Sequence, residues 1–140
     1  FSDAYTNVSG TDFNPNWGQS TAVSQTPIAG NNTLKYTGLN YQGTQFASAL
    51  NVSSYGFIHI DYYTANSTSL KFYLISGVYP NSVETAYTLS VPSGVGANTN
   101  GWKIVDIPLS SFSPVALNNI TQFKVDGNGD IFFDNIYFHN

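Results

Sequence analysis

Hydrophobic and polar residues alternate with a period of two along most of this chain, and clusters of Gly, Pro, Asn and Ser separate the alternating runs. This pattern is typical of β-strands joined by tight turns. No segment gathers apolar residues with the period of 3.6 that an amphipathic helix requires. We predict strands over Ser2–Thr6, Thr33–Leu39, Tyr41–Leu50, Phe57–Thr64, Ser69–Ile75, Thr85–Val91, Trp102–Pro108, Ile120–Asp126 and Ile131–Phe138. Short strands without a helix indicate one all-β domain over residues 1–140, an antiparallel sandwich or barrel.

The same alternation assigns side chains to faces. Several strands carry an aliphatic face, which belongs in the core, and an opposite face of polar and aromatic residues. These polar and aromatic positions are His59, Asp61, Tyr63, Lys71, Tyr73, Lys124 and Asp126. A solvated sheet surface is the simplest interpretation of them. A sugar-binding face has the same character, because it offers rings for stacking with short polar groups between them.

Composition narrows the function further. The chain has ten Tyr, ten Phe and two Trp, few charged residues and a net charge of −4. This balance is the opposite of a nucleic-acid-binding footprint, and no apolar run is long enough to span a membrane. Without cysteine, disulfides and thiolate metal sites are excluded. The uncharged polar surface favours an extracellular location, and we expect a mature segment or a domain of a larger polypeptide.

A carboxylate interrupts the apolar run at the end of the chain. Counting by twos, Phe132, Asp134, Ile136 and Phe138 share one face. A carboxylate on an apolar face needs hydrogen-bond donors or a metal. The chain has no Arg and only four Lys, so a hard cation such as Ca²⁺ is the simplest partner for Asp134. The alternative is that Asp134 accepts backbone N–H bonds at a bulge.

The best candidate for ligand recognition is an indole in a polar loop. Trp17 lies within Asp12–Ser20, a stretch with no alternating pattern that would bury the ring. Exposed aromatic rings on loops mark recognition sites more often than packing. Neighbouring amides complete a glycan site in which we include Asn16, Gln19 and Trp17, together with Tyr41 and Gln42. We expect Trp102, at the start of a strand, to pack in the core instead.

The sequence offers few residues that could form a catalytic site. The chain has a single Glu, Glu84, and two histidines, and no pair of carboxylates is placed for glycoside hydrolysis. Asp126-Gly-Asn-Gly-Asp130 matches the start of a calcium-binding loop, but the rest of that motif is absent. We interpret it as a tight turn between antiparallel strands. The sequence therefore favours a binding protein over an enzyme.

Several segments resemble one family of proteins. Gly101-Trp-Lys-Ile-Val-Asp-Ile-Pro-Leu-Ser-Ser-Phe112, His59-Ile-Asp-Tyr-Tyr-Thr-Ala65 and Phe133-Asp-Asn-Ile-Tyr-Phe-His139 are similar to segments of jelly-roll carbohydrate-binding modules. Asn14-Pro-Asn-Trp-Gly-Gln19 and Leu39-Asn-Tyr-Gln-Gly-Thr44 look like further stretches of the same modules. These modules are appended to secreted bacterial glycoside hydrolases, including laminarinase-type enzymes. Tyr63 stands where the related segment often has Trp.

The resemblance implies a jelly-roll β-sandwich of two antiparallel sheets that binds polysaccharide without cleaving it. It implies β-1,3-glucan (laminarin) as the first ligand, and a covalently attached catalytic domain that the module holds near its substrate. It also implies a structural Ca²⁺ held by Asp134 and, from the first strand, Asp3. Two other functions stay open. One is a jelly-roll glycosidase or polysaccharide lyase, in which His59, Tyr63 and Lys71 gather on one face; the other is a structural or adhesive surface domain.

Overall fold

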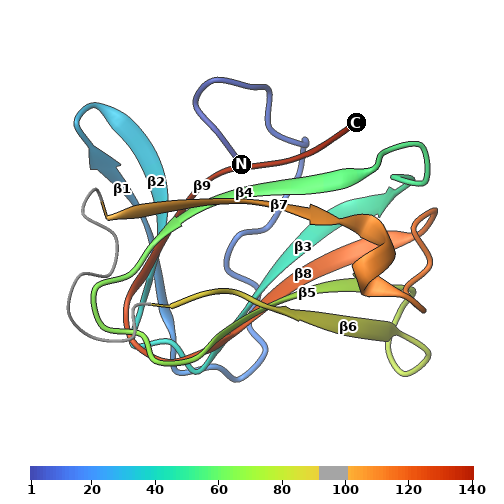
Figure 1. The fold of residues 1–140 in the computed structure, drawn as a ribbon. Coiled ribbons are helices and arrows are strands. Elements are labelled where there is room, and N and C mark those ends of the chain that lie inside the picture. The colour runs from blue at the N-terminus through green and yellow to red at the C-terminus, as the bar shows by residue number, and fades with distance from the viewer. Residues whose placement is uncertain (92–100) are drawn as a thin grey trace.

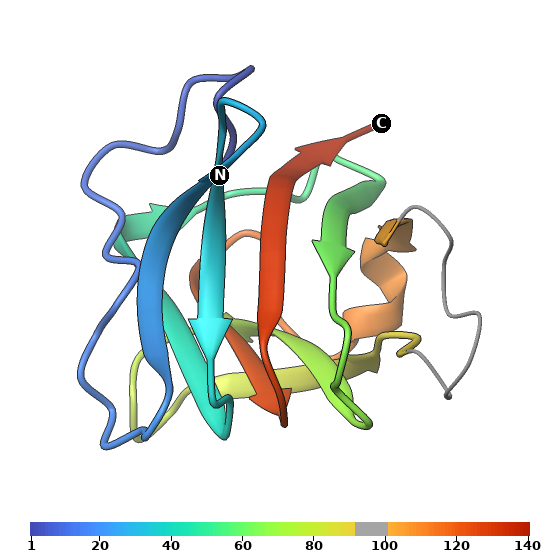
Figure 2. The same ribbon diagram turned by 90° about the vertical axis from the view of Figure 1, so that its left-hand side faces the viewer.

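Two antiparallel sheets face each other in the computed structural model, which describes residues 1–91 and 101–140 (Figure 1). The five-stranded sheet has the order β1 (Ala22–Ile28), β2 (Asn31–Thr37), β9 (Ile131–His139), β4 (Phe57–Tyr63) and β7 (Trp102–Pro108). The four-stranded sheet has the order β3 (Tyr41–Leu50), β8 (Ile120–Gly127), β5 (Leu70–Ser76) and β6 (Val83–Thr88). Figure 2 shows the five-stranded sheet from its outer side. This is the predicted jelly-roll β-sandwich.

The strand prediction was wrong at the N-terminus. Residues 2–6 form no strand; instead Phe1 exchanges two main-chain hydrogen bonds with Ile136 of β9, both 2.9 Å long. The prediction also missed β1, whose centre is the polar run Ser24-Gln25-Thr26 and which includes Pro27. This strand lies at the sheet edge, where neither a missing N–H nor a weak apolar pattern prevents pairing.

Aliphatic and aromatic side chains from the inner faces of both sheets fill the space between them, as the alternation predicts. Phe72 and Phe133 are each 1% exposed, and Ile58 and Ile60 of β4 are fully buried. Burying each such side chain stabilises the fold by about 1.5–3 kcal/mol. A 3₁₀ turn, η1 (Leu109–Phe112), inserts Phe112 at one end of the core. No helix in residues 1–91 or 101–140 has the length and apolarity to cross a membrane.

A β-bulge changes the alternation in β9. His59 and Asp61 of β4 pair with Tyr137 and Asp134, so three steps along β9 oppose two steps along β4. The extra residue, Asn135, has a φ of +48°, the left-handed conformation typical of such bulges.

The bulge reverses the phase of the side chains that follow it. Ile136 and Phe138 pack against the core, whereas Phe132 pairs with Tyr63, whose side chain lies on the outer face. The prediction that Phe132, Asp134, Ile136 and Phe138 share one face was therefore wrong.

The turn between β8 and β9 carries the chain from one sheet to the other. A tight turn was predicted here, but the two strands that it joins do not pair with each other. Gly127 has a φ of +150°, and a Cβ at this position would lie 1.9 Å from the main-chain oxygen of Ser69. The side-chain oxygen of Asn128 accepts a hydrogen bond from the Thr68 N–H (2.8 Å). Asp130 likewise accepts from the Gly38 N–H (2.9 Å), so protein N–H groups occupy oxygens that a calcium loop would use.

Candidate functional site

The outer face of the four-stranded sheet carries the best candidate site. The strand register places Gly43 of β3, Lys124 of β8, Tyr73 of β5 and Ala86 of β6 in one row across the sheet. Two flanking rows also face outward. They contain Tyr41, Asp126, Lys71 and Thr88 on one side, and Gln45, Gln122, Ile75 and Glu84 on the other. This face is polar and aromatic, and the opposite face of the same strands belongs to the core.

Trp17 covers one end of the middle row. A Cβ built on Gly43 would lie 2.5–2.7 Å from three atoms of the six-membered indole ring, so the ring rests directly on the glycine. The Tyr41 hydroxyl donates a hydrogen bond to the Trp17 main-chain oxygen (2.7 Å). The Trp17 N–H donates to the side-chain oxygen of Gln19 (2.7 Å). A glycine in the strand thus permits close approach of the ring, and two polar side chains hold its loop.

Trp17 and Tyr41 form one side of a cleft of about 840 Å³ over this sheet. On the other side lies Tyr79, from the loop between β5 and β6, which is 88% exposed. The floor includes Gln122 and Lys124. Aromatic rings at the sides and hydrogen-bonding groups on the floor are the arrangement that a carbohydrate requires, because a sugar ring has both C–H faces and hydroxyls.

The charged groups of the cleft are partnered within it. Lys124 Nζ lies 2.8 and 2.9 Å from the two carboxylate oxygens of Glu84 and 4.1 Å from the centroid of the Tyr73 ring. The Tyr73 hydroxyl donates to Asp126 at 2.6 Å. Burial, and then the hydrogen bond to Asp126, raise the pKa of Tyr73 to about 12. The phenol therefore stays neutral at physiological pH, and the floor offers donors and acceptors in fixed positions.

The residues predicted to form a glycan site around Trp17 do not all line the cleft. Trp17 and Tyr41 line the cleft, whereas Gln42 is fully buried, so its inclusion as a ligand-binding residue was wrong. Its side-chain oxygen accepts a hydrogen bond from Gln19 (3.2 Å), and it supports the loop from below. Asn16 is exposed, and its side-chain oxygen accepts from the Gly18 N–H (3.1 Å).

The other predicted face belongs to the five-stranded sheet. His59, Asp61 and Tyr63 lie on β4, whereas Lys71 lies on β5 of the four-stranded sheet. The predicted gathering of His59, Tyr63 and Lys71 was therefore wrong, and with it the lyase arrangement built on those residues. The outward residues of β4 and of β5 show the same alternation of polar and apolar positions, so the sequence pattern could not assign them to different sheets. Trp102 pairs with Tyr63, with the ring centroids 6.2 Å apart, and is partly exposed, so its predicted core position was wrong.

Asp106 of β7 and His139 of β9 lie beside His59 on this outer face. Asp106 contacts both histidines, and hydrogen bonds from His59 and then His139 hold the pKa of its carboxyl below the usual range. The Asn140 main-chain oxygen, followed by Asp106, raises the pKa of His139.

Asp134 has hydrogen-bond donors at both carboxylate oxygens. The Asn135 N–H donates to one oxygen (2.8 Å) and the Asn31 side-chain amide donates to the other. The Asn135 N–H is the main-chain donor at a bulge that the sequence analysis gave as the alternative to a metal. Because both oxygens have donors, Asp134 can be buried at only 4% exposure. Asp3 accepts from the Asn32 N–H at 2.6 Å. Because Asn31 and Asn32 are adjacent, both predicted calcium ligands contact the start of β2.

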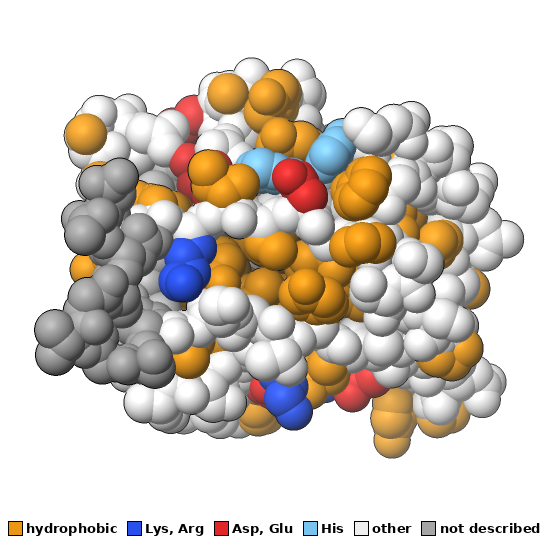
Figure 3. Space-filling view, viewed as in Figure 1, with side chains coloured by type: hydrophobic (Ala, Val, Ile, Leu, Met, Phe, Trp, Pro, Cys, Tyr) orange, Lys and Arg blue, Asp and Glu red, His pale blue; other side chains and the backbone are white. Residues whose placement is uncertain are grey.

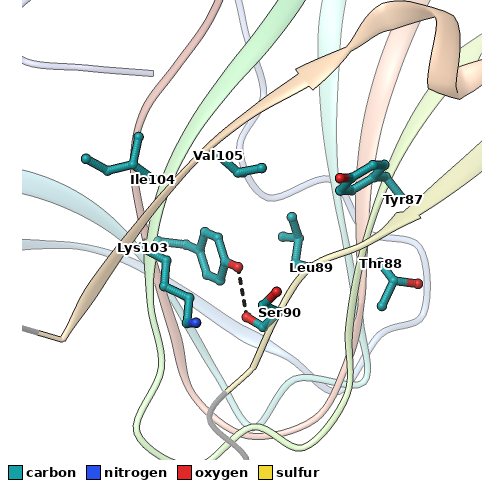
Figure 4. A pocket seen from close by; sticks show the side chains of 8 residues that line it. Tyr87, Thr88, Leu89, Ser90, Lys103, Ile104 and Val105 are labelled. Carbon is teal, nitrogen blue, oxygen red and sulfur yellow. Dashed lines mark hydrogen bonds between the residues drawn. The ribbon is translucent and has the colours of Figure 1, made fainter. Parts of the chain in front are cut away.

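A second cavity, of about 430 Å³, opens between β7 and the segment that follows β6 (Figures 3 and 4). Leu89 and Val105 line it, and Ser90 accepts a hydrogen bond from the Tyr62 hydroxyl (2.8 Å). Lys103 is the charged residue of its described lining. Tyr87 and Thr88 add further hydroxyl groups to this lining.

Sequence reasoning did not include Tyr73, Tyr79, Gln122, Lys124 or Asp126 in the Trp17 site. Tyr79 carries the same signal as Trp17, since it is an aromatic residue within a polar loop, Gly77–Ser82. The others were assigned to polar strand faces, but the pattern does not say which strands share a sheet.

Comparison with known proteins finds similarity in the fold only. No family model and no curated protein matches the sequence. The fold is similar to a family 11 carbohydrate-binding module from Clostridium thermocellum solved with a β-1,3-1,4-mixed-linked tetrasaccharide (TM-score 0.63, 18% identity, covering 99% of this chain and 93% of that one).

Two other modules are similar to the same degree. One is a family 28 module specific for non-crystalline cellulose (TM-score 0.61, 18% identity, 94% and 88% covered). The other is a family 30 module of a cellulosomal cellulase of Clostridium thermocellum (TM-score 0.60, 15% identity, 87% and 83% covered). The chain therefore has the jelly-roll β-sandwich fold of carbohydrate-binding modules.

Proposed function

We propose that this protein is a non-catalytic carbohydrate-binding module, and that it binds polysaccharide in the cleft over the outer face of the four-stranded sheet. The observation that carries the proposal is that Trp17 and Tyr79 both line the cleft, together with polar side chains of the sheet such as Gln122 and Lys124. Rings on both sides can stack on sugar C–H faces, and Lys124 and Gln122 can bind hydroxyls between them.

Neutral β-glucan is the substrate class that the cleft favours. The positive charge of Lys124 is already balanced by Glu84, and Asp126 adds a negative charge to the same floor. A sulfated polyanion would find no excess of positive charge here, whereas hydroxyl groups meet both donors and acceptors. Within this class we propose β-1,3-glucan, such as laminarin, on the sequence resemblance described above.

We further propose that the module acts outside the cell and is attached to a glycan-degrading enzyme. Tethering a binder to a catalyst raises the local concentration of substrate without new chemistry. The module itself has no catalytic role in this proposal. Glu84 and Asp126 are the acidic side chains of the cleft, and both are engaged by protein partners, Lys124 and Tyr73.

The test is calorimetric titration of the isolated domain with laminarin, mixed-linkage β-glucan and soluble cellulose oligosaccharides, alongside reducing-end assays. We expect binding to at least one glucan, no new reducing ends, and loss of binding in Lys124→Met. Because exposed ion pairs contribute only about 0–1 kcal/mol to stability, Lys124→Met should remain folded. The matched control Lys103→Met, outside the cleft, should bind as the parent does. Failure of all glucans to bind, or equal binding by Lys124→Met, contradicts the proposal.

A further inference from the structure

Three side chains on the outer face of the five-stranded sheet converge on one point. His59 of β4, Asp106 of β7 and His139 of β9 have ligand atoms that all lie within 4.8 Å of one another. Adjacent strands bring them together, because His59 pairs with Asp106 and with Tyr137, two residues before His139. Figure 3 shows histidine side chains on either side of a carboxylate at this surface.

The hydrogen bonds of this cluster need more protons than its neutral form carries. His59 Nδ1 and His139 Nε2 lie 2.8 and 2.7 Å from the same oxygen, Asp106 Oδ1. The remaining nitrogens also face oxygens: His59 Nε2 lies 2.9 Å from Asp61 Oδ1, and His139 Nδ1 lies 3.1 Å from the main-chain oxygen of Asn140. These four contacts need four N–H groups, but two neutral imidazoles supply only two.

A divalent cation satisfies the same contacts without extra protons. If each imidazole keeps the N–H that faces Asp61 or Asn140, then His59 Nδ1 and His139 Nε2 present lone pairs toward Asp106. One ion of charge +2 between these atoms takes the place of the two protons that two neutral imidazoles lack. Imidazole nitrogen with one carboxylate is a donor set suited to zinc and its neighbours among the transition metals.

The surroundings of His59 hold its ring in place for this role. Asp61 holds the far nitrogen of His59, and Asn135 in turn donates to the other oxygen of Asp61 (2.8 Å). A carboxylate behind a metal-binding histidine orients the ring and strengthens it as a ligand. The His59 ring also stacks on Tyr137, with centroids 4.6 Å apart and planes 15° apart. Around a tetrahedral zinc, ligand atoms lie about 3.4 Å apart. This spacing falls between the 2.7 and 2.8 Å distances from the two histidine nitrogens to Asp106 and the 4.8 Å within which all three ligand atoms lie.

We propose that His59, Asp106 and His139 bind one Zn²⁺ ion, with water completing its coordination, and that the ion links β4, β7 and β9. The side chains of Asp106 and His139 are 46% and 32% exposed, so an ion can reach the site from solvent. The site faces away from the cleft, because the two lie on opposite sheets. Its three ligands differ from the calcium ligands predicted above, Asp3 and Asp134, although Asp134 pairs with Asp61 in the sheet.

The chain makes this inference easy to test, because His59 and His139 are its only histidines and it has no cysteine. Calorimetric titration of the whole chain with Zn²⁺ at neutral pH should give one equivalent, with the imidazole NMR signals of both histidines shifting together. The His139→Ala variant should bind at least tenfold more weakly. Asp61→Asn keeps all three ligands and should weaken binding by about 10–100-fold, the usual effect of removing a supporting carboxylate.

Two controls separate the site from adventitious binding. Asp126→Asn removes a carboxylate from the opposite sheet and should leave zinc affinity unchanged. Calcium in excess should not displace zinc, since oxygen-preferring ions do not favour imidazole. Melting curves without zinc establish whether each variant is folded. If His139→Ala does not fold, His59→Gln replaces it as the histidine variant. No saturable binding to the parent chain, or zinc affinity equal in parent and folded histidine variants, overturns the proposal.

Discussion

The indole of Trp17 occupies the space that a side chain on Gly43 would need, since a Cβ there would lie 2.5 Å from the ring. Gly43→Ala should therefore displace the ring from the cleft without touching the loop that carries it. A stacking aromatic at a binding hot spot contributes on the order of 2 kcal/mol, so both Gly43→Ala and Trp17→Ala should weaken glucan binding by about thirtyfold.

The double variant distinguishes this mechanism from two independent effects. If Gly43→Ala acts by moving Trp17, combining it with Trp17→Ala adds nothing further to the loss of affinity. Calorimetric titration with the best-bound glucan measures both. Gly56→Ala is the matched control, because an added Cβ there meets nothing closer than 4.0 Å and the residue lies outside the cleft. Additive losses, or unchanged affinity in Gly43→Ala, would show that the ring position is irrelevant to binding.

Two aromatic residues on the five-stranded sheet should differ in their contribution to stability. Phe133 is 1% exposed within the core, so Phe133→Ala should lower the free energy of unfolding by about 3–5 kcal/mol. Trp102 is partly exposed at the edge strand β7, and Trp102→Ala should cost about 1–2 kcal/mol. Urea denaturation of both variants checks the order. A larger loss for Trp102→Ala would restore the core role that its sequence position suggested.

Alkaline pH should destabilise the fold through buried phenols. Burial raises the pKa of Tyr36 and of Tyr62 to about 12, from the ordinary value of 10. Because the folded state holds these protons more tightly, the stabilisation is fully present below pH 10 and is lost as the pH rises toward 12. Melting temperatures should therefore fall across this window.

The variant Tyr62→Phe isolates one of these groups. Its melting temperature should start lower at neutral pH, because the hydrogen bond to Ser90 is lost, but should fall less steeply between pH 10 and 12 than that of the parent. Ultraviolet absorbance of tyrosinate gives the ionisation directly. Parallel curves for parent and variant would mean that Tyr62 does not titrate in this range.

The calcium prediction concerns Asp134. A cation that binds only the folded state stabilises it by about 2.7 kcal/mol when the free metal exceeds its dissociation constant a hundredfold. A chelator should then lower the melting temperature of the calcium-loaded protein, and Asp134→Ala should abolish this response. A melting curve that stays the same after confirmed removal of metal would leave Asp134 with its hydrogen bonds to Asn31 and Asn135 as its whole role.

The sequence predicted local structure better than long-range pairing. Alternation located eight of the strands because each buries one face, but it missed β1, whose edge position demands no apolar stripe. Alternation could not place Lys71 and His59 on different sheets, because a period of two shows which residues of a strand share a face but not which strands pair with each other. The bulge at Asn135 was equally hidden, because a left-handed asparagine leaves no mark on the apolar pattern. Trp17 could be singled out from the sequence because its loop has no alternating pattern that would bury the indole, and the structure places it in the lining of the cleft.

Gly127 limits how the cleft can be engineered. Any other residue at this position would collide with the Ser69 main-chain oxygen, and the preceding residue, Asp126, belongs to the cleft floor. A library that retargets the module to another glycan can therefore diversify outward-facing positions such as Gln45 and Gln122, whose side chains leave the core untouched. It should hold Gly127 invariant, because a shifted turn would move the binding surface and the strand crossing to the opposite sheet at once. Selection on such a library would recover new specificities from the strand faces, and only glycine at residue 127.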